Sequence, residues 1–139
     1  MQAFYWAILA ALVWGTAPLL EKMGLMKIDV LPGLFWRIFG VLIGLALLLV
    51  FKFSVVKEAL SAKPQTIVLI VLGGFLASFV GQIFFYKALK LGELSRVVPL
   101  AATYPVVTFI LGILFLSEKI TLTKLSGVAL VISGILLLK

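Results

Sequence analysis

The stretch "GGFLASFVGQIFFY", Gly73 to Tyr86, carries the strongest information on the fold. It lies inside Thr66–Tyr86, a run without charged residues that is long enough to cross a bilayer. Small and polar residues interrupt the stretch at steps of four. One series is Gly73, Ala77 and Gly81, and the neighbouring series is Gly74, Ser78, Gln82 and Tyr86. Because a four-residue step keeps side chains on one slowly drifting helix face, the stretch predicts a membrane helix with a small edge beside a polar edge.

The composition of the whole chain agrees with a membrane location. Of its 139 residues, 64% are hydrophobic and 12% are charged, whereas a soluble domain is about half apolar and about a quarter charged. A chain this apolar would expose large hydrophobic patches in water. The sequence therefore predicts an integral membrane protein.

The residue types that are missing argue against an enzyme. The chain has no Cys and no His, which excludes thiolate chemistry and removes the commonest metal ligand and general base. None of its carboxylates falls in a paired hydrolytic motif. We therefore expect no catalytic activity, no metal and no cofactor. The net charge of +7 is spread over the segments between apolar runs, which favours contact with anionic lipid headgroups over nucleic acid.

Apolar runs of about 20 residues, the length needed to span a bilayer, predict the helices. The expected helices cover residues 3–26, 31–52, 66–90, 94–117 and 121–138. The last run is short and reaches span length only if it begins near Ile120 and Lys124 extends to the interface. The prediction is an all-α, multi-pass protein of the cell membrane, with one domain over residues 1–139 folded as a bundle of five transmembrane helices.

An odd number of spans places the two termini on opposite sides of the membrane. The N-terminal side then carries five Lys or Arg residues and the other side seven, counting Arg37 just inside the second helix. This difference weakly favours a cytoplasmic C-terminus, and it leaves insertion in both orientations open.

Small residues recur at helical spacing in most of the predicted helices. Close approach of such residues allows helices to pack in lipid. The positions we expect to mediate packing are Gly15, Gly40, Gly44, Gly73, Ala77, Gly81, Gly127 and Gly134. They predict a tight bundle rather than independent anchors.

Polar residues inside the apolar runs predict a solute pathway. The residues expected to line it are Trp14, Lys22, Arg37, Ser78, Gln82, Tyr86, Thr103 and Tyr104, and Glu21 is the expected proton-linked carboxylate. Each also has a structural alternative. Hydroxyls such as those of Thr103 and Thr108 can bond a backbone carbonyl one turn back, long cationic side chains can extend to the interface, and Gln82 can join helices.

Three prolines add to this prediction. Pro18 lies in the first helix, and Pro99 and Pro105 lie in the fourth. Each removes a backbone hydrogen bond and frees a carbonyl one turn earlier. Kinked or broken helices beside polar residues are typical of the pathway in secondary transporters, although such a kink can also serve packing alone.

The order of several motifs resembles a known family. The motifs are "ALVWGTAPLLEKMGL", "PGLFWRIFGVLIGL", "FFYKALKLGELSRVVPLAATYPVVTFILGILFLSEKIT" and "LSGVALVISGILLL". Together they resemble the EamA-like domain of the drug/metabolite transporter superfamily, and they cover nearly the whole chain. The resemblance implies a single five-helix unit, half of a ten-helix transporter built from inverted repeats. It also implies that a second copy closes the pathway, as a homodimer that an antiparallel arrangement would make similar to the inverted repeat.

The function expected from these observations is secondary transport of a small organic solute, such as an amino acid or another metabolite, by alternating access. A subunit of a lipid-carrier flippase is one alternative and predicts a lateral opening. A non-transporting scaffold or regulatory subunit is another and predicts polar residues bonded fully to one another. We expect Glu118 to have a structural role at the turn into the last helix.

Overall fold

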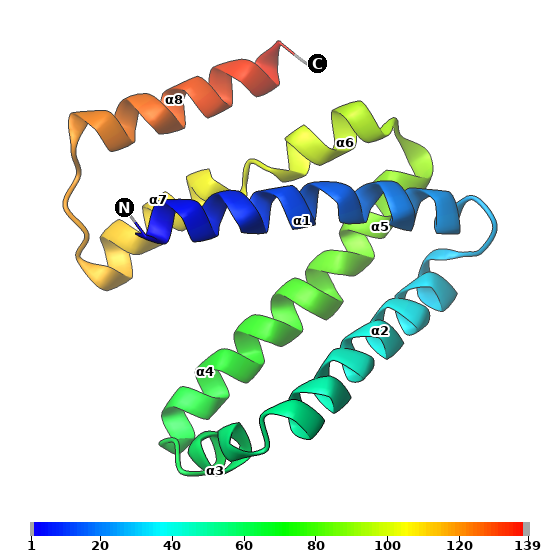
Figure 1. Cartoon of the computed structure of the whole chain (residues 1–139). Coiled ribbons are helices and arrows are strands. Elements are labelled where there is room, and N and C mark those ends of the chain that lie inside the picture. Colours follow the sequence, from blue (N-terminus) through cyan, green and yellow to red (C-terminus); the bar gives the residue numbers. More distant parts are fainter. Residues whose placement is uncertain (1, 138–139) are drawn as a thin grey trace. The chain divides into compact units, whose positions relative to one another are not determined.

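The computed structural model describes residues 2–137, and every regular element in that range is helical (Figure 1). The elements are α1 (Gln2–Leu25), α2 (Val30–Phe51), α3 (Ser54–Leu60), α4 (Pro64–Phe75), the π-helical turn η1 (Leu76–Val80), α5 (Gly81–Leu91), α6 (Leu94–Ala101), α7 (Tyr104–Leu116) and α8 (Leu122–Leu136). They form two compact units, Met1–Leu91 and Gly92–Lys139.

Four helical segments among the described residues are long and apolar enough to cross a membrane. They are Gln2–Leu25, Val30–Phe51, Pro64–Leu91 and Leu94–Leu116. The all-helical, multi-pass prediction is therefore confirmed. The fifth segment, α8, is a shorter apolar helix of 15 residues, which is about 22 Å at the usual rise per residue. Its predicted end at residue 138 lies outside the described residues, and its crossing stays a prediction.

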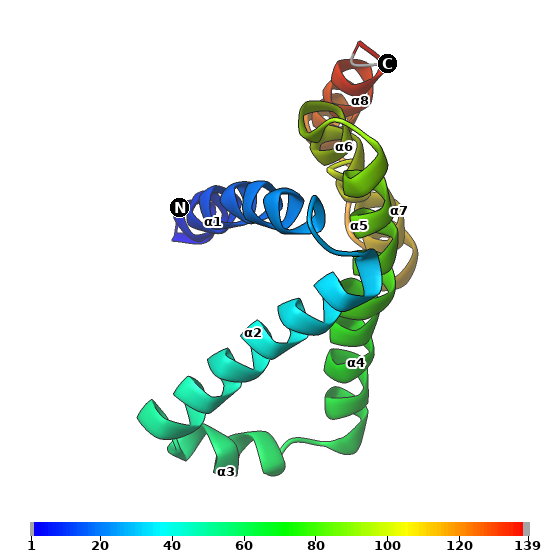
Figure 2. The same cartoon turned by 90° about the vertical axis from the view of Figure 1, so that its right-hand side faces the viewer.

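In the first unit, a turn over residues 26–29 joins α1 to α2, and the two helices diverge from it (Figure 2). Asp29 lies in extended backbone directly before α2. The short helix α3, inside a connection for which the sequence predicts no helix, leads to α4, which begins with Pro64. A proline suits this position because the first backbone N–H groups of a helix have no partner within it. From Pro64 onward, α4, η1 and α5 run as one continuous segment.

The core of the first unit lies where α1, α2 and α5 meet. Its buried apolar side chains are Leu25, Leu34, Tyr86 and Leu89. Gly33 allows this approach: a Cβ placed on it would lie 2.8 Å from Leu25 Cδ2 and 3.5 Å from Tyr86 Cε2. Most other large apolar side chains are exposed, as expected for helices that face lipid or further protein.

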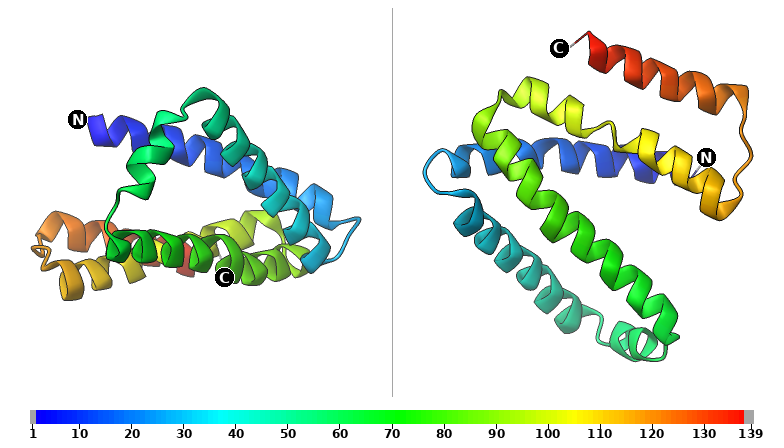
Figure 3. Two further views of the ribbon diagram at one scale, coloured as in Figure 1. Left: turned by 90° about the horizontal axis from the view of Figure 1, so that it is seen from below. Right: turned by 180° about the vertical axis from the view of Figure 1, so that it is seen from behind.

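The second unit contains a broken helix followed by a helical hairpin (Figure 3). The break between α6 and α7 covers Ala102 and Thr103. Pro99 lies inside α6, and Pro105 lies in the first turn of α7, where its missing N–H costs no hydrogen bond. By contrast, α1 runs through Pro18 as one helix.

The turn between α7 and α8 depends on Ser117 and Thr121. Ser117 adopts the left-handed conformation, with φ 52°. The hydroxyl of Thr121 caps α8 by accepting a hydrogen bond from Lys124 N at 3.3 Å. Such a cap satisfies one of the N–H groups that a helix start leaves unpaired.

Glycines differ in what lies beside them. A Cβ added at Gly33, Gly81 or Gly112 would have a neighbour within 4 Å. The same test finds open space at Gly15, Gly40, Gly44, Gly73, Gly127 and Gly134. The packing role predicted for this second group therefore stays a prediction.

Candidate functional site

Three helices of the first unit bring polar side chains to one point. Glu21 comes from α1, Arg37 from α2 and Gln82 from α5. The Oε1 atom of Glu21 accepts a hydrogen bond from Arg37 Nε at 3.3 Å and another from Gln82 Nε2 at 3.2 Å. A carboxylate, a guanidinium group and an amide are thus joined between segments that are otherwise apolar.

The cluster is largely withdrawn from the surface. Gln82 is 9% exposed, and the side chains of Glu21 and Arg37 are 17% and 27% exposed. Tyr86, one turn after Gln82, is 3% exposed, and its hydroxyl interacts with Glu21 and Gln82. Because an uncompensated charge away from water is costly, the opposite charges of Glu21 and Arg37 stabilise each other here.

Arg37 makes a second contact, with the π-helical turn. Its Nη1 atom donates to the carbonyl of Ser78 at 3.1 Å. Ser78 lies in η1, where the bond from Gly81 N to Leu76 O spans five residues instead of four. Single π-helical turns inside α-helices are frequent at functional sites. The sequence predicts a role for the Ser78 side chain, whereas the structure uses its carbonyl.

Two lysines of the same unit make contacts near the turn that joins α1 to α2. Lys22 donates from Nζ to the carbonyl of Leu89. Lys90 donates to Ile28 O at 3.2 Å and pairs with Asp29. The hydrogen bond from Lys90, together with its charge, lowers the pKa of Asp29 below its usual value of 3.8. A small pocket of about 240 Å³ lies here, lined by Lys22, Leu25, Met26 and Lys90.

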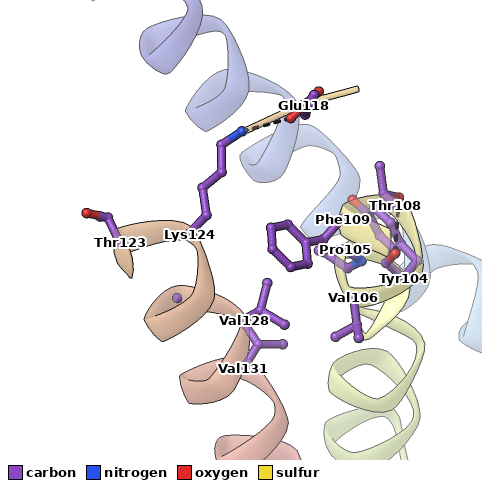
Figure 4. Close-up of a pocket in the computed structure, with 11 residues that line it drawn as sticks. Tyr104, Pro105, Val106, Thr108, Phe109, Glu118, Thr123, Lys124, Val128 and Val131 are labelled. Carbon is purple, nitrogen blue, oxygen red and sulfur yellow. Dashed lines mark hydrogen bonds and ion pairs between the residues drawn. The ribbon is translucent and has the colours of Figure 1, made fainter. Parts of the chain in front are cut away.

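The second unit has a larger, mostly apolar pocket between α7 and α8, of about 560 Å³ (Figure 4). Tyr104 and Thr108 line it from α7, and the ring of Phe109 points toward α8. At one end Lys124 Nζ pairs with Glu118 Oε2 at 2.8 Å. The backbone N–H of Glu118 also donates to Gly112 O at 3.2 Å. These contacts agree with the structural role expected of Glu118 at the turn into α8.

The predicted pathway residues divide between the two units. Glu21, Arg37, Gln82 and Tyr86 meet in the cluster. Trp14 belongs to the same unit but is 66% exposed. In the second unit, the Thr103 hydroxyl donates to Leu100 O at 2.8 Å and the Thr108 hydroxyl to Tyr104 O at 3.1 Å. These two threonines follow the structural alternative, a bond to the preceding turn of backbone.

The sequence reasoning missed the pairing of Glu21 with Arg37, although a signal was available. Both residues lie a short distance from the turn between α1 and α2, one on each of the two helices that the turn connects. Counted from that turn, Glu21 lies about 6 Å back along α1 and Arg37 about 10 Å along α2, at about 1.5 Å per residue. Opposite charges at similar depth in adjacent apolar helices are expected to pair.

Comparisons with known proteins identify the family. The EamA-like transporter family matches residues 1–139. An uncharacterized protein of Methanocaldococcus jannaschii is 32% identical over 133 residues, covering 94% of this chain and 91% of that protein. An uncharacterized transporter in the cobO 3′ region of a Sinorhizobium species is 32% identical over 140 residues, covering 96% of this chain and 94% of that protein.

The chain covers a smaller share of a third, longer relative. An uncharacterized transporter of Archaeoglobus fulgidus is 31% identical over 137 residues, which cover 99% of this chain but 46% of that protein. The chain thus spans about half the length of this relative. No solved structure matches the chain. The match of the family over the full chain, together with relatives above 30% identity, agrees with the apolar helices: the chain belongs to the EamA-like transporter family.

Proposed function

We propose that this membrane protein is a secondary transporter that moves a small organic solute by alternating access. The observation that carries the proposal is the cluster of Glu21, Arg37 and Gln82 between apolar helices. Polar and charged groups are expensive at membrane depth, and they occur there mainly along solute or ion pathways. Family membership supports transport as the purpose of this cluster.

The proposed pathway has polar and aromatic parts. Gln82 and the backbone of the π-helical turn orient the solute by hydrogen bonds, and Arg37 and Lys22 attract an anionic group. Aromatic rings supply flat apolar walls. The residues proposed to line the pathway are Trp14, Lys22, Arg37, Ser78, Gln82, Tyr86, Thr103 and Tyr104, with Glu21 as the carboxylate that couples transport to protons.

We further propose that a second five-helix unit closes the pathway and that a second copy of the chain supplies it. Two observations support this proposal. The chain covers 46% of the Archaeoglobus transporter, and Gly40 and Gly44 of α2 and Gly127 and Gly134 of α8 have open space beside them. Because the chain has no native Cys, cross-linking of single-Cys variants in native membranes tests the dimer. Monomer at every labelled position in α1, α2 and α8 would count against it.

Transport is tested with the purified protein in liposomes loaded against a panel of amino acids, organic acids and amines. The decisive variant is Gln82→Leu, which removes the amide bonded to Glu21 at 3.2 Å. Gln65→Leu is its matched control, because Gln65 is exposed near the start of α4. A buried hydrogen bond to a charged group contributes about 1.5–3 kcal/mol, so we expect Gln82→Leu to lower the transport rate about tenfold or more while Gln65→Leu behaves as wild type.

Two outcomes would contradict this proposal. If Gln82→Leu transports every solute at the wild-type rate while remaining folded, Gln82 is outside the pathway. If the wild-type protein moves no solute, a non-transporting scaffold becomes the better explanation of the polar cluster. Movement of a lipid-linked headgroup without any soluble substrate would favour the flippase alternative.

A further inference from the structure

At the centre of the site, the carboxylate of Glu21 is paired with the cationic side chain of Arg37. Glu21 Oε1 accepts from Arg37 Nε at 3.3 Å and from Gln82 Nε2 at 3.2 Å, so donors from α2 and α5 converge on one oxygen atom. Guanidinium and amide N–H groups donate to any carboxylate. The two donors therefore form a binding site for a carboxylate group. In this structure the carboxylate of Glu21 fills that site.

The contact between Glu21 and Arg37 is open to exchange. Among the contacts described for residues 2–137, Glu21 meets Arg37 through Nε, whereas Nη1 bonds to Ser78 O. The pair is thus not the two-point arrangement that makes Arg–carboxylate contacts strong, and 3.3 Å exceeds the roughly 2.7–2.9 Å of a typical charge-assisted bond. The side chains of Glu21 and Arg37 keep 17% and 27% of their surface exposed, so the pair is not sealed within the first unit.

The geometry points to a carboxylate-exchange site. A small organic carboxylate displaces Glu21 from Arg37 and Gln82, and Glu21 takes up one proton as it is displaced. This inference rests on the proposed proton-coupled transport function and names its substrate class. The proton is required because two carboxylates that share one cation cannot both stay ionised at low cost. The site then keeps the same net charge before and after binding, which limits the desolvation penalty.

The groups around Glu21 identify it as the proton acceptor. Arg37 of α2 is bonded directly to its carboxylate. On α5, Tyr86 is buried beside it, and Lys87 is exposed. On α1 itself, Lys22 donates to Leu89 O. Lys90 is paired with Asp29 directly before the start of α2. Among these groups, the carboxylate in contact with Arg37 is that of Glu21. Glu21 is therefore the group that takes up the proton when a second carboxylate binds Arg37.

The experiment measures binding of three carboxylate probes, acetate, benzoate and glutamate, to the full-length protein in nanodiscs by calorimetry. Benzamide serves as the uncharged analogue of benzoate. The measurements run at about pH 6 and about pH 8, where these carboxylic acids stay ionised. Repeating them in buffers of different ionisation enthalpy gives the number of protons taken up per molecule bound.

For the wild-type protein we expect at least one carboxylate probe to bind with uptake of one proton and with affinity that falls about tenfold per pH unit. Glu21→Gln keeps an oxygen acceptor for Arg37 and Gln82 but cannot titrate. It should bind the probe with the same affinity at both pH values and with no proton uptake. At the upper pH this affinity should exceed that of the wild-type protein. Arg37→Gln should lose binding of the probe. Glu118→Gln, in the second unit, should keep the wild-type pH dependence, and benzamide should not bind.

Two results would overturn the inference. One is that none of the three probes binds to wild type or to Glu21→Gln; the other is that Glu21→Gln keeps the proton uptake. Neither result removes the proposed transport function, which stands if liposomes accumulate a neutral or cationic solute in a way that depends on Gln82. Conversely, loss of all transport together with intact, proton-linked carboxylate binding would remove the transport proposal and leave the binding site.

Discussion

Among the glycines of the first unit, Gly33 has the closest neighbour. A Cβ there would lie 2.8 Å from Leu25 Cδ2, and Leu25 is itself 3% exposed. We predict that Gly33→Ala destabilises the protein relative to Gly40→Ala, a matched change in α2 where a Cβ meets open space. Both changes gain helix propensity of about 1 kcal/mol, whereas overpacking costs Gly33→Ala about 1–3 kcal/mol.

Thermal unfolding of both variants in the same detergent measures this difference. The Gly40→Ala variant should unfold at or above the wild-type temperature, and the Gly33→Ala variant below that of Gly40→Ala. Equal unfolding temperatures for the two variants would show that Leu25 can move aside at no cost and that the close approach is not a constraint.

Asp29 provides a test of the ion pair with Lys90 directly before α2. Lys90 lowers the pKa of Asp29 below 3.8, so the contact contributes stability above pH 3.8 and loses it as the pH falls through the lowered value. We predict that Lys90→Gln returns the pKa of Asp29 toward 3.8 without unfolding α5. Titration of the Asp29 carboxyl carbon by NMR measures the shift. An identical titration in both proteins would show that the pair does not persist in the membrane-mimetic environment.

At the scale of single elements, the π-helical turn depends on Gly81. A Cβ at this position would lie 3.1 Å from the carbonyl oxygen of Leu76, the acceptor of the bond that defines the turn. Gly74→Ala is the matched control, because a Cβ on Gly74 meets nothing within 4 Å in the same continuous segment. We predict that Gly81→Ala is less stable than Gly74→Ala by about 1 kcal/mol, at the lower end of overpacking costs.

Hydrogen exchange distinguishes a local effect from a general one. In Gly81→Ala we expect faster exchange confined to the amides around residues 76–82, because the shifted Leu76 carbonyl weakens the turn. Unchanged exchange in that range would mean that the carbonyl tilts aside freely, and the turn would then be no obstacle to a larger residue.

The elements were predictable to the extent that they depend on apolar length. The long helices begin and end within two residues of the ranges expected for them. The sequence did not predict α3, since a helix of seven residues leaves no apolar period of sufficient length. Nor did it predict η1, because a π-helical turn has the same residue types as the α-helix around it. The break before Tyr104 was indicated by Pro99 and Pro105, because a proline inside a helix removes a hydrogen bond and is best accommodated in the first turn of a new helix.

For the site, the sequence predicted which residues take part better than it predicted the contacts between them. It singled out Glu21, Arg37 and Gln82 because charged or amide side chains in apolar helices need an explanation. It assigned Arg37 to a solute, whereas in the structure Glu21 occupies that cation. Pairing depends on the relative rotation of two helices, and a single sequence contains no direct measure of it. Contacts to backbone atoms, such as the Ser78 carbonyl, leave no trace in residue identity.

At the scale of the whole molecule, α8 decides the number of membrane crossings. Its described length of 15 residues corresponds to about 22 Å, less than the roughly 30 Å of hydrocarbon. Thinning of the bilayer and flanking residues that reach the interface can make up such a difference. Lys124 pairs with Glu118 at 2.8 Å near the start of α8, which places charge where an interface would be. We therefore predict that α8 crosses the membrane.

Single cysteines test this prediction, because the chain has none of its own. From a given side of the membrane, a membrane-impermeant maleimide should label the same fraction of Asp29→Cys and Leu137→Cys, and the complementary fraction of Lys119→Cys. If α8 lay along the surface instead, Leu137→Cys and Lys119→Cys would show the same labelled fraction. The near balance of five and seven Lys or Arg residues across the membrane further predicts that each position labels partly from both sides, since the positive-inside preference is weak. Labelling of Asp29→Cys from a single side would show one fixed orientation, and an antiparallel dimer could then not form.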